Sequence, residues 1–408
     1  MNKFLESASI AFEAIWAAKL RSLMTVLGNI VAVTSIIAVV SLVQGLNAAV
    51  TSAILNQAGA DSFNIQQFPV TRSDEEFDKV RNNPRVTLAD ASAIERNRDL
   101  IAAVMAQSNG GGRVAYRDKS IDNTQVQGVT ADFGSFSTFD AERGRLMSPT
   151  EVQQARPVAI IGWQTADRLF GQTVDPIDKV IQVSGVHFRV VGVSAKRGSL
   201  LGQSQDQFVV IPLGQFQQLF GSRRSLSLLV KPRDMSRMPE AMDEATVALR
   251  SARRLKPRQG DNFGMYTSDT ILGIYHSATN GIFAVLIGVV ALSLVVGGIV
   301  IMNIMLMVVT ERTREIGLRK ALGARRSDIM AQMLTESVVL SIFGGLVGTL
   351  LGATIALVIS SFTPVPSAVE PWSVALGIVV TALVGLFFGL YPAMRAARLD
   401  PIEALRKE

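Results

Sequence analysis

Four long apolar segments, almost free of charge, constrain this chain more than any other feature. The first runs from about Leu23 to Val43, and the others cover 282–309, 338–359 and 374–391. An apolar stretch of about 18 or more residues with few charges is typical of a membrane-spanning helix. Apolar residues make up 48% of the chain and charged residues only 18%. We therefore predict an α-helical membrane protein with four transmembrane helices.

The first two spans are longer than a bilayer requires. Thr270–Thr310 contains no Asp, Glu, Lys or Arg over about 41 residues, or roughly 60 Å of helix, whereas the hydrocarbon core is about 30 Å thick. Ser22–Ala60 has the same excess of uncharged sequence. We expect both helices to project beyond the bilayer as a stalk that carries the sequence between them.

The N-terminal segment 1–60 is predicted to hold an amphipathic helix followed by the first span. Over 1–21, apolar residues recur at roughly helical spacing with charged residues between them. This pattern favours an amphipathic helix along the inner membrane face. The alternative is that these residues simply extend the first span. A signal peptide is the competing interpretation of the first span. Its apolar run and leader are both longer than those of a normal signal peptide, which favours a retained span.

The segment between the first two spans, 61–269, has the composition of a soluble domain. Short alternating runs bounded by turn residues predict strands, and two longer periodic runs predict helices at Leu88–Asn97 and Pro239–Leu255. Ser184 and Gly185 are predicted to form a two-residue hairpin turn. We expect an α+β extracytoplasmic domain with an inserted subdomain at 133–221. The run Gly110-Gly111-Gly112 is interpreted as a flexible turn.

The C-terminal region, 270–408, contains a short charged helix between the second and third spans. Thr310–Ala324 is rich in charge and nearly free of turn residues until Gly323, which is placed to end the helix; Ser327 can then cap the next helix. Glu315 precedes Arg319 by four residues, which favours a helix. Ile316, Leu318 and Leu322 supply apolar surface. A solvated loop that only sets topology is the alternative to a docking helix.

The third span carries a stripe of glycines. Gly344, Gly348 and Gly352 recur every four residues, which allows close packing of a second helix, although glycine is common in spanning helices generally. In the C-terminal tail, Asp400, Pro401 and Glu403 form the capping pattern of a short helix.

Charge asymmetry predicts the orientation. The 310–337 loop and the tail contain Arg312, Arg314, Arg319, Lys320, Arg325, Arg326, Arg395, Arg398, Arg406 and Lys407. The loop 360–373 contains no Lys or Arg. Positive residues favour the cytosolic side, so both termini are expected in the cytosol and the large domain outside. The net charge of +6 is assigned to lipid headgroups and topology, with no nucleic-acid partner.

Several kinds of chemistry are not supported by the sequence. No lysine follows a glycine, so the chain contains no Gly-x-x-x-x-Gly-Lys-Ser/Thr loop for ATP phosphates. The two histidines, His187 and His276, lack the spacing of a metal site, and there is no cysteine. We expect no catalytic residue, no metal site and no cofactor bound by this chain.

Several segments resemble one family. MNIMLMVVTERTREIGLRKALGARRSDIMAQMLTESVVLSIFGGLVGTLLG is similar to the permease signature of MacB/FtsX-type ABC transporters. The N-terminal WAAKLRSLMTVLGNIVAV and the terminal YPAMRAARLDPIEALR resemble the ends of the same family. RPVAIIGWQTADRLFG, VHFRVVGV and QDQFVVIPL resemble its periplasmic core domain.

This resemblance implies a permease without catalytic activity that works with a separate ABC ATPase, which would bind ATP and Mg. The residues that it places at the ATPase-coupling site are Glu311, Arg314, Glu315, Ile316, Arg319 and Lys320. The family further implies an inner-membrane location, a second permease copy in a homodimer or heterodimer, and mechanotransmission of ATP-driven movement to the outer domain. Members with this domain plan resemble exporters with a periplasmic adaptor; relatives extract lipoproteins or activate cell-wall hydrolases.

Overall fold

The fold is taken from a computed structural model. It describes residues 19–59, 61–71, 73–96, 99–136, 140–171, 173–200, 202–363, 367 and 370–406. The described residues form two compact units: Val50–His276, and the residues up to Ala49 together with Ser277–Glu408. The amphipathic helix predicted over 1–21 lies almost wholly outside the described residues.

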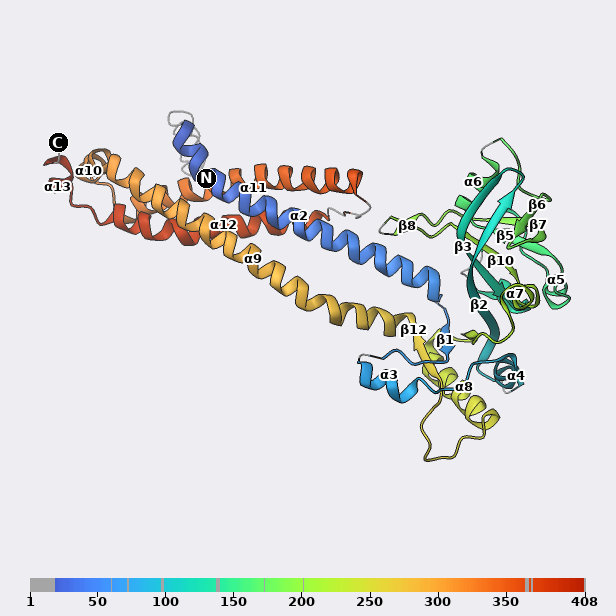
Figure 1. The fold of residues 1–408 in the computed structure, drawn as a ribbon. Coiled ribbons are helices and arrows are strands. Elements are labelled where there is room, and N and C mark those ends of the chain that lie inside the picture. The colour runs from blue at the N-terminus through green and yellow to red at the C-terminus, as the bar shows by residue number, and fades with distance from the viewer. Residues whose placement is uncertain are drawn as a thin grey trace. The chain divides into compact units, whose positions relative to one another are not determined.

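Within the described residues, four helices are long and apolar enough to cross a membrane (Figure 1). They are α2 (Lys19–Ala58), α9 (Ser268–Glu311), α11 (Arg326–Phe362) and α12 (Pro371–Ala397). The number of spans agrees with the sequence prediction. Helices α2 and α9 are continuous over 40 and 44 residues, about twice the length that a bilayer needs.

The unit Val50–His276 is built on one large sheet. Its strands follow the path β12-β1-β11-β2-β3-β10-β5-β7-β4, and β6 pairs with both β2 and β7. The strands of this sheet are β1 (Phe63–Gln66), β2 (Ile101–Tyr116), β3 (Lys119–Val129), β4 (Ala141–Gly144), β5 (Val158–Ile161), β6 (Val180–Val183), β7 (Val186–Ser194), β10 (Phe208–Pro212), β11 (Ser227–Pro232) and β12 (Gly264–Thr267). A separate hairpin is formed by β8 (Ser199–Leu200) and β9 (Gln203–Ser204).

Six short helices of the described residues bury side chains in this domain: α4 (Leu88–Arg96), η1 (Ala131–Ser135), α5 (Pro149–Gln153), α6 (Trp163–Phe170), α7 (Leu213–Phe220) and α8 (Met238–Ala252). Two more, α3 (Asp74–Val80) and η2 (Met235–Arg237), contain no buried residue. The predicted helices at Leu88–Asn97 and Pro239–Leu255 correspond to α4 and α8. The predicted hairpin turn is confirmed, because Ser184 and Gly185 both have positive φ, at 47° and 95°, between β6 and β7.

The segment predicted as an inserted subdomain, 133–221, shares its sheet and its core with the rest of the domain. Strands β2, β3, β10, β5, β7 and β6 pair in a closed ring, and two of these six strands, β2 and β3, precede the segment. One buried cluster joins Phe63 and Ile94 to Phe188 and Phe216. The segment therefore contributes strands and buried residues to the same sheet and core as the rest of the unit Val50–His276.

The prediction of a flexible turn at Gly110-Gly111-Gly112 is wrong, because all three residues lie inside β2. They pair with residues of β3, and Gly110 and Gly112 face aromatic side chains of α7. A Cβ atom at Gly128 on the neighbouring strand would lie 2.4 Å from the Cβ of Phe216. The glycines therefore make room for an aromatic helix on the sheet.

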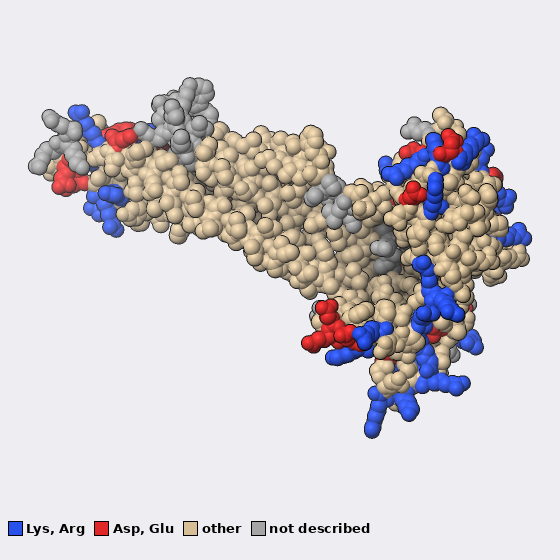
Figure 2. Space-filling view, in the orientation of Figure 1, with Lys and Arg blue, Asp and Glu red and all other residues tan. Residues whose placement is uncertain are grey.

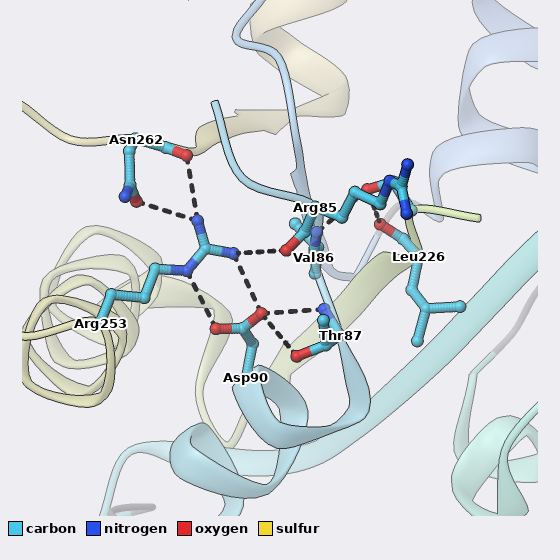
Figure 3. A network of polar contacts seen from close by, with 8 residues as sticks. Arg85, Val86, Thr87, Asp90, Leu226, Arg253 and Asn262 are labelled. Atoms are coloured by element: carbon cyan, nitrogen blue, oxygen red, sulfur yellow. Dashed lines mark hydrogen bonds and ion pairs between the residues drawn. The ribbon is translucent and has the colours of Figure 1, made fainter. Parts of the chain in front are cut away.

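A buried ion pair joins α4 to the end of α8 (Figure 3). The Arg253 guanidinium donates to both carboxylate oxygens of Asp90, at 2.9 and 3.0 Å, and also to Asn262. Burial acts to raise the pKa of Asp90, but the bonds from Arg253 and Thr87 outweigh it, so this pKa lies below its usual range. Each charge thus has its partner, as a buried pair requires.

Candidate functional site

The short charged helix predicted after the second span is present as α10 (Thr313–Ala321), which follows α9 after one non-helical residue, Arg312. The Thr313 hydroxyl donates to the carbonyls of Val309 and Thr310, a pattern that bends helices. The chain therefore changes direction between α9 and α10 with few residues in between.

The end of α10 has the geometry that its glycine predicts. Gly323 has a φ of +101°, its N–H donates to the carbonyl of Lys320, and the N–H of Ala324 donates to the carbonyl of Arg319. These two bonds define a Schellman motif. The prediction of a C-cap glycine is confirmed.

The start of α11 differs from the prediction that Ser327 caps it. The cap residue is Arg325, whose backbone N–H donates to the carboxylate of Asp328 at 3.1 Å. Ser327 lies inside the first turn. The acidic side chain at the third helical position therefore takes the capping role, and the chain turns two residues earlier than expected.

The inner side of α10 is anchored in an apolar cluster. Ile316 is 1% exposed and packs with Met305 of α9, Met333 of α11 and Ala393 of α12. Ile316 was among the predicted coupling residues. Its side chain is buried within the chain, so it holds α10 in place and offers no surface to another protein.

Polar contacts fix the same side of α10 to its neighbours. Arg319 donates to Glu315 at 2.6 Å and to Gln332 of α11 at 2.8 Å. The Lys320 ammonium donates to the backbone carbonyl of Ala397 at 3.0 Å and to that of Leu399. These carbonyls end α12, where a cation complements the helix dipole. Arg319 and Lys320 therefore brace α10.

A partly buried ion pair supports the bend before α10. Arg312 lies 3.3 Å from Glu336 of α11, and the Glu336 side chain is only 13% exposed. In the sequence Arg312 was noted only as one of the positive loop residues, and Glu336 was not noted at all. The spacing of 24 residues between them gives no local signal.

A glycine in the middle of α10 brings in the C-terminal helix. A Cβ atom at Gly317 would lie 2.6 Å from the Cβ of Ala404 in α13 (Pro401–Arg406). The Asp400 carboxylate caps α13 by accepting from the N–H of Ile402 at 2.8 Å, as the tail sequence predicts. The packing role of Gly317 was not predicted from the sequence, although a glycine inside a helix is itself a sign of close packing.

An exposed stripe is formed by Arg314, Glu315, Leu318 and Leu322 on the outer side of α10, together with Glu311, which is exposed at the end of α9 just before the bend. A spacing of three and four residues places the four side chains from Arg314 to Leu322 along one face. Leu318 is 53% exposed and Leu322 is 81% exposed. Figure 2 shows charged side chains gathered at the end of the long helices where α10 and α13 lie. The stripe therefore combines acidic and basic side chains with exposed apolar side chains.

The predicted glycine stripe of α11 contacts α2. A Cβ atom at Gly348 would lie 2.8 Å from the Cβ of Val33, and one at Gly352 would lie 2.9 Å from the Cβ of Ile37. Gly344 is also buried. Only glycine allows these two helices to approach so closely.

The outer ends of α2 and α9 are joined to the sheet and to each other. Strand β1 follows α2, strand β12 precedes α9, and the two strands pair from Phe63 to Gln66. The hydroxyl of Ser268, the first residue of α9, donates to the carbonyl of Gly59 at 2.7 Å. A displacement of one helix end against the other must therefore deform the sheet.

Two family matches cover most of the chain. Residues 22–248 match the MacB-like periplasmic core domain, and residues 282–401 match the FtsX-like permease C-terminal region. The two matches are separated by residues 249–281, which include the start of α9. Together with the four candidate spans, they identify an inner-membrane protein with an extracytoplasmic domain.

Curated relatives are similar over the whole chain. The chain is 35% identical over 100% of its length to a macrolide export ATP-binding/permease protein MacB from Bdellovibrio bacteriovorus, and 35% identical over 98% to one from Chlorobaculum tepidum. It spans 62% and 61% of those two proteins. A crystal structure of the periplasmic region of MacB from Actinobacillus actinomycetemcomitans matches 54% of this chain and 95% of its own, at 19% identity and a TM-score of 0.44.

Proposed function

Because the chain belongs to the family of MacB-like, FtsX-like ABC transporter permeases, we propose that it transmits ATP-driven movement across the inner membrane to its outer domain. In this proposal a separate ABC ATPase binds and hydrolyses ATP, and the permease works as a dimer in export or efflux. Both termini and α10 lie in the cytosol. The 408 residues contain no phosphate-binding loop of the Gly-x-x-x-x-Gly-Lys-Ser/Thr type, which supports the assignment of ATP binding to residues outside them.

The observation that carries the proposal is the continuity of α9. This helix begins directly after β12 and ends one residue before α10. Over 44 residues it contains no internal proline, and a helix of this length is about 66 Å long. One unbroken helix therefore connects α10 to the β1–β12 pair, and in this proposal it carries force from one to the other.

The exposed stripe of α10 is the surface proposed to dock on the ATPase. Leu318 and Leu322 supply apolar contact, while Glu311, Arg314 and Glu315 supply charges that fix partner and register. The inner side of α10 is held against the rest of the chain by Ile316, Gly317, Arg319 and Lys320. This division separates the six coupling residues expected from the sequence into a docking set and a bracing set.

The test compares ATP hydrolysis by three samples in lipid nanodiscs: the purified chain, a candidate ABC ATPase, and the two co-expressed proteins. We expect the chain alone to be inactive and the co-purified pair to be more active than the ATPase alone. An ATPase that hydrolyses ATP at the same rate with and without the chain, and does not co-purify with it, would oppose the proposal. Hydrolysis by the pure chain would oppose the assignment of ATP chemistry to a separate subunit.

Orientation is tested with single cysteines, which the cysteine-free chain makes simple to interpret. Arg258 is exposed in the outer domain and Ser327 is exposed beside α10. An impermeant maleimide applied to spheroplasts should label Arg258→Cys and spare Ser327→Cys. The reverse pattern would contradict the assigned topology.

A further inference from the structure

The unit Val50–His276 contains a cavity of about 500 Å³ on one face of the sheet. Small-molecule sites usually have volumes of about 300–1,000 Å³. Its most unusual feature is a set of seven carboxamide side chains. Gln205 is one of them, and the other six lie on the sheet: Asn64, Gln66, Gln107, Asn109, Gln125 and Gln127. These six occupy alternate positions on β1, β2 and β3, so they point to the same face of the sheet.

Strand pairing aligns these amides into a row. Ser227 of β11 lies opposite Gln107, and its hydroxyl donates to the Oδ1 of Asn64 at 3.4 Å. Farther along, Asn109 lies opposite Gln127, and Phe208 lies opposite Gln125. The row crosses β1, β11, β2, β3 and β10, a distance of about 19 Å at the usual spacing between strands.

Strand propensity does not account for this row. Asparagine is disfavoured in strands, whereas β-branched and aromatic residues are favoured. Among the described residues that line the cavity, Arg197 is the one that is charged. Within the described part of the chain, the side chains of Gln107, Gln125 and Gln127 make no hydrogen bond, so their donors and acceptors remain available to water or a ligand.

Two aromatic residues complete the lining. Phe208 lies beside Gln125, but it is only 4% exposed and the guanidinium of Arg197 lies 5.1 Å from its ring centroid. Tyr266 of β12 is partly exposed at the other end of the row. Burial raises the pKa of the Tyr266 hydroxyl, which therefore stays neutral at physiological pH. The Tyr266 ring is thus the more accessible of the two aromatic surfaces beside the uncharged amides.

We propose that this cavity, the amide row, is a binding site for a neutral saccharide. A carboxamide both donates and accepts hydrogen bonds, as a sugar hydroxyl does, and ring faces pack against the C–H face of a sugar. With Arg197 as the single charged side chain in its described lining, the cavity has little charge to favour a strongly charged ligand. An extended peptide adds as a strand at a sheet edge, whereas the row lies on the face of the sheet.

The site lies wholly within one unit and uses no residue of α10. It therefore goes beyond the proposed function, and its test is independent of ATPase docking.

The experiment is saturation-transfer NMR on the full chain in phosphatidylcholine nanodiscs, which avoids detergents with sugar headgroups. The probes are maltotetraose, cellotetraose and chitotetraose, with a Gly-Ser-Gly-Ser peptide as the comparator. We expect transfer to the C–H protons of at least one saccharide and none to the peptide. No transfer to any saccharide, or transfer to the peptide alone, overturns the proposal.

The variants locate the binding. The double substitution Gln107→Leu with Gln127→Leu should weaken saccharide affinity about tenfold or more, because two hydrogen-bonding groups are lost. The control is Gln182→Leu, the same change at an exposed strand position outside the cavity. If the double variant does not insert, Gln125→Glu removes two amide donors at an exposed position with little change in size. Unchanged binding in the variant that is measured overturns the proposal.

Discussion

Gly317 of α10 packs directly against Ala404 of α13: a Cβ atom on Gly317 would lie 2.6 Å from the Cβ of Ala404. Gly317→Val should displace α13 at a cost of about 1–3 kcal/mol, because the backbone must shift to admit the new side chain. Amide hydrogen exchange of 401–406 should become faster. Ala321→Val is the control, since Ala321 is exposed on the same helix. Equal exchange in both variants would show that this packing is unimportant.

The Arg312–Glu336 pair should support the bend between α9 and α10. Arg312→Met leaves a mostly buried carboxylate without its partner, and we expect a loss of about 1–3 kcal/mol in stability. Adding Glu336→Gln removes the unpaired charge and should restore part of that loss. Thermal unfolding of the three proteins in nanodiscs measures both effects. A double variant no more stable than Arg312→Met would contradict this explanation.

The contact of α11 with α2 depends on two glycines. Gly348→Val and Gly352→Val should each lower membrane abundance or thermal stability, because a side chain would collide with Val33 or Ile37 at under 3.0 Å. Gly288→Val in α9 is the matched control, since no atom lies within 4 Å of its Cβ position. Similar stability in all three variants would show that the close contact of α11 with α2 does not stabilise the protein.

The Asp90–Arg253 pair should make the outer domain sensitive to acid. The folded-state pKa of Asp90 is depressed, so its contribution to stability is complete at neutral pH and is lost as the pH falls below about 4. Arg253→Met should cost about 3–5 kcal/mol at pH 7, because both side chains are only 9% exposed. Hydrogen exchange of α4 and α8 at neutral and acidic pH checks both statements. Asp118→Asn, in an exposed turn, is the control.

A second acidic residue should act in the same pH range. Glu151 accepts two bonds from Arg145 and one from the backbone of Ser148, which lower its pKa to about 2. Its contribution is therefore also present above about 4.5 and lost toward pH 2. Glu151→Gln should reduce the acid dependence of exchange in α5 and leave that of α4 unchanged.

The sequence predicted the spans well because a bilayer demands long uncharged helices, and few other structures produce a run such as Thr270–Thr310. Local signals were also reliable where a single residue controls the backbone, as at Gly323 and Ser184-Gly185. These features depend on neighbours in the sequence.

Contacts between distant segments could not be predicted. The glycines 110–112 resemble a turn locally, but α7, about 100 residues later, covers them as part of a strand. Ile316 resembles docking surface on an isolated helix, whereas residues of α9, α11 and α12 bury it. The buried and exposed sides of α10 are distinguished only by its contacts with the other helices, which its own sequence does not reveal.

The central claim is that the exposed stripe of α10 docks on an ATPase, and one charge reversal tests it most directly. Arg314→Glu alters the stripe, whereas Arg326→Glu makes the same change at an exposed position just past the loop that ends α10. Both change the charge of the same loop equally, so membrane insertion should be affected alike.

The measurement is the amount of ATPase that co-purifies with each variant, normalised to permease abundance in the membrane. A lost charge contact at a desolvated interface costs about 2–5 kcal/mol, so Arg314→Glu should lower co-purification at least tenfold. Arg326→Glu should retain it. Full co-purification and full stimulated ATP hydrolysis with Arg314→Glu, at normal abundance, would show that α10 is only a topological loop.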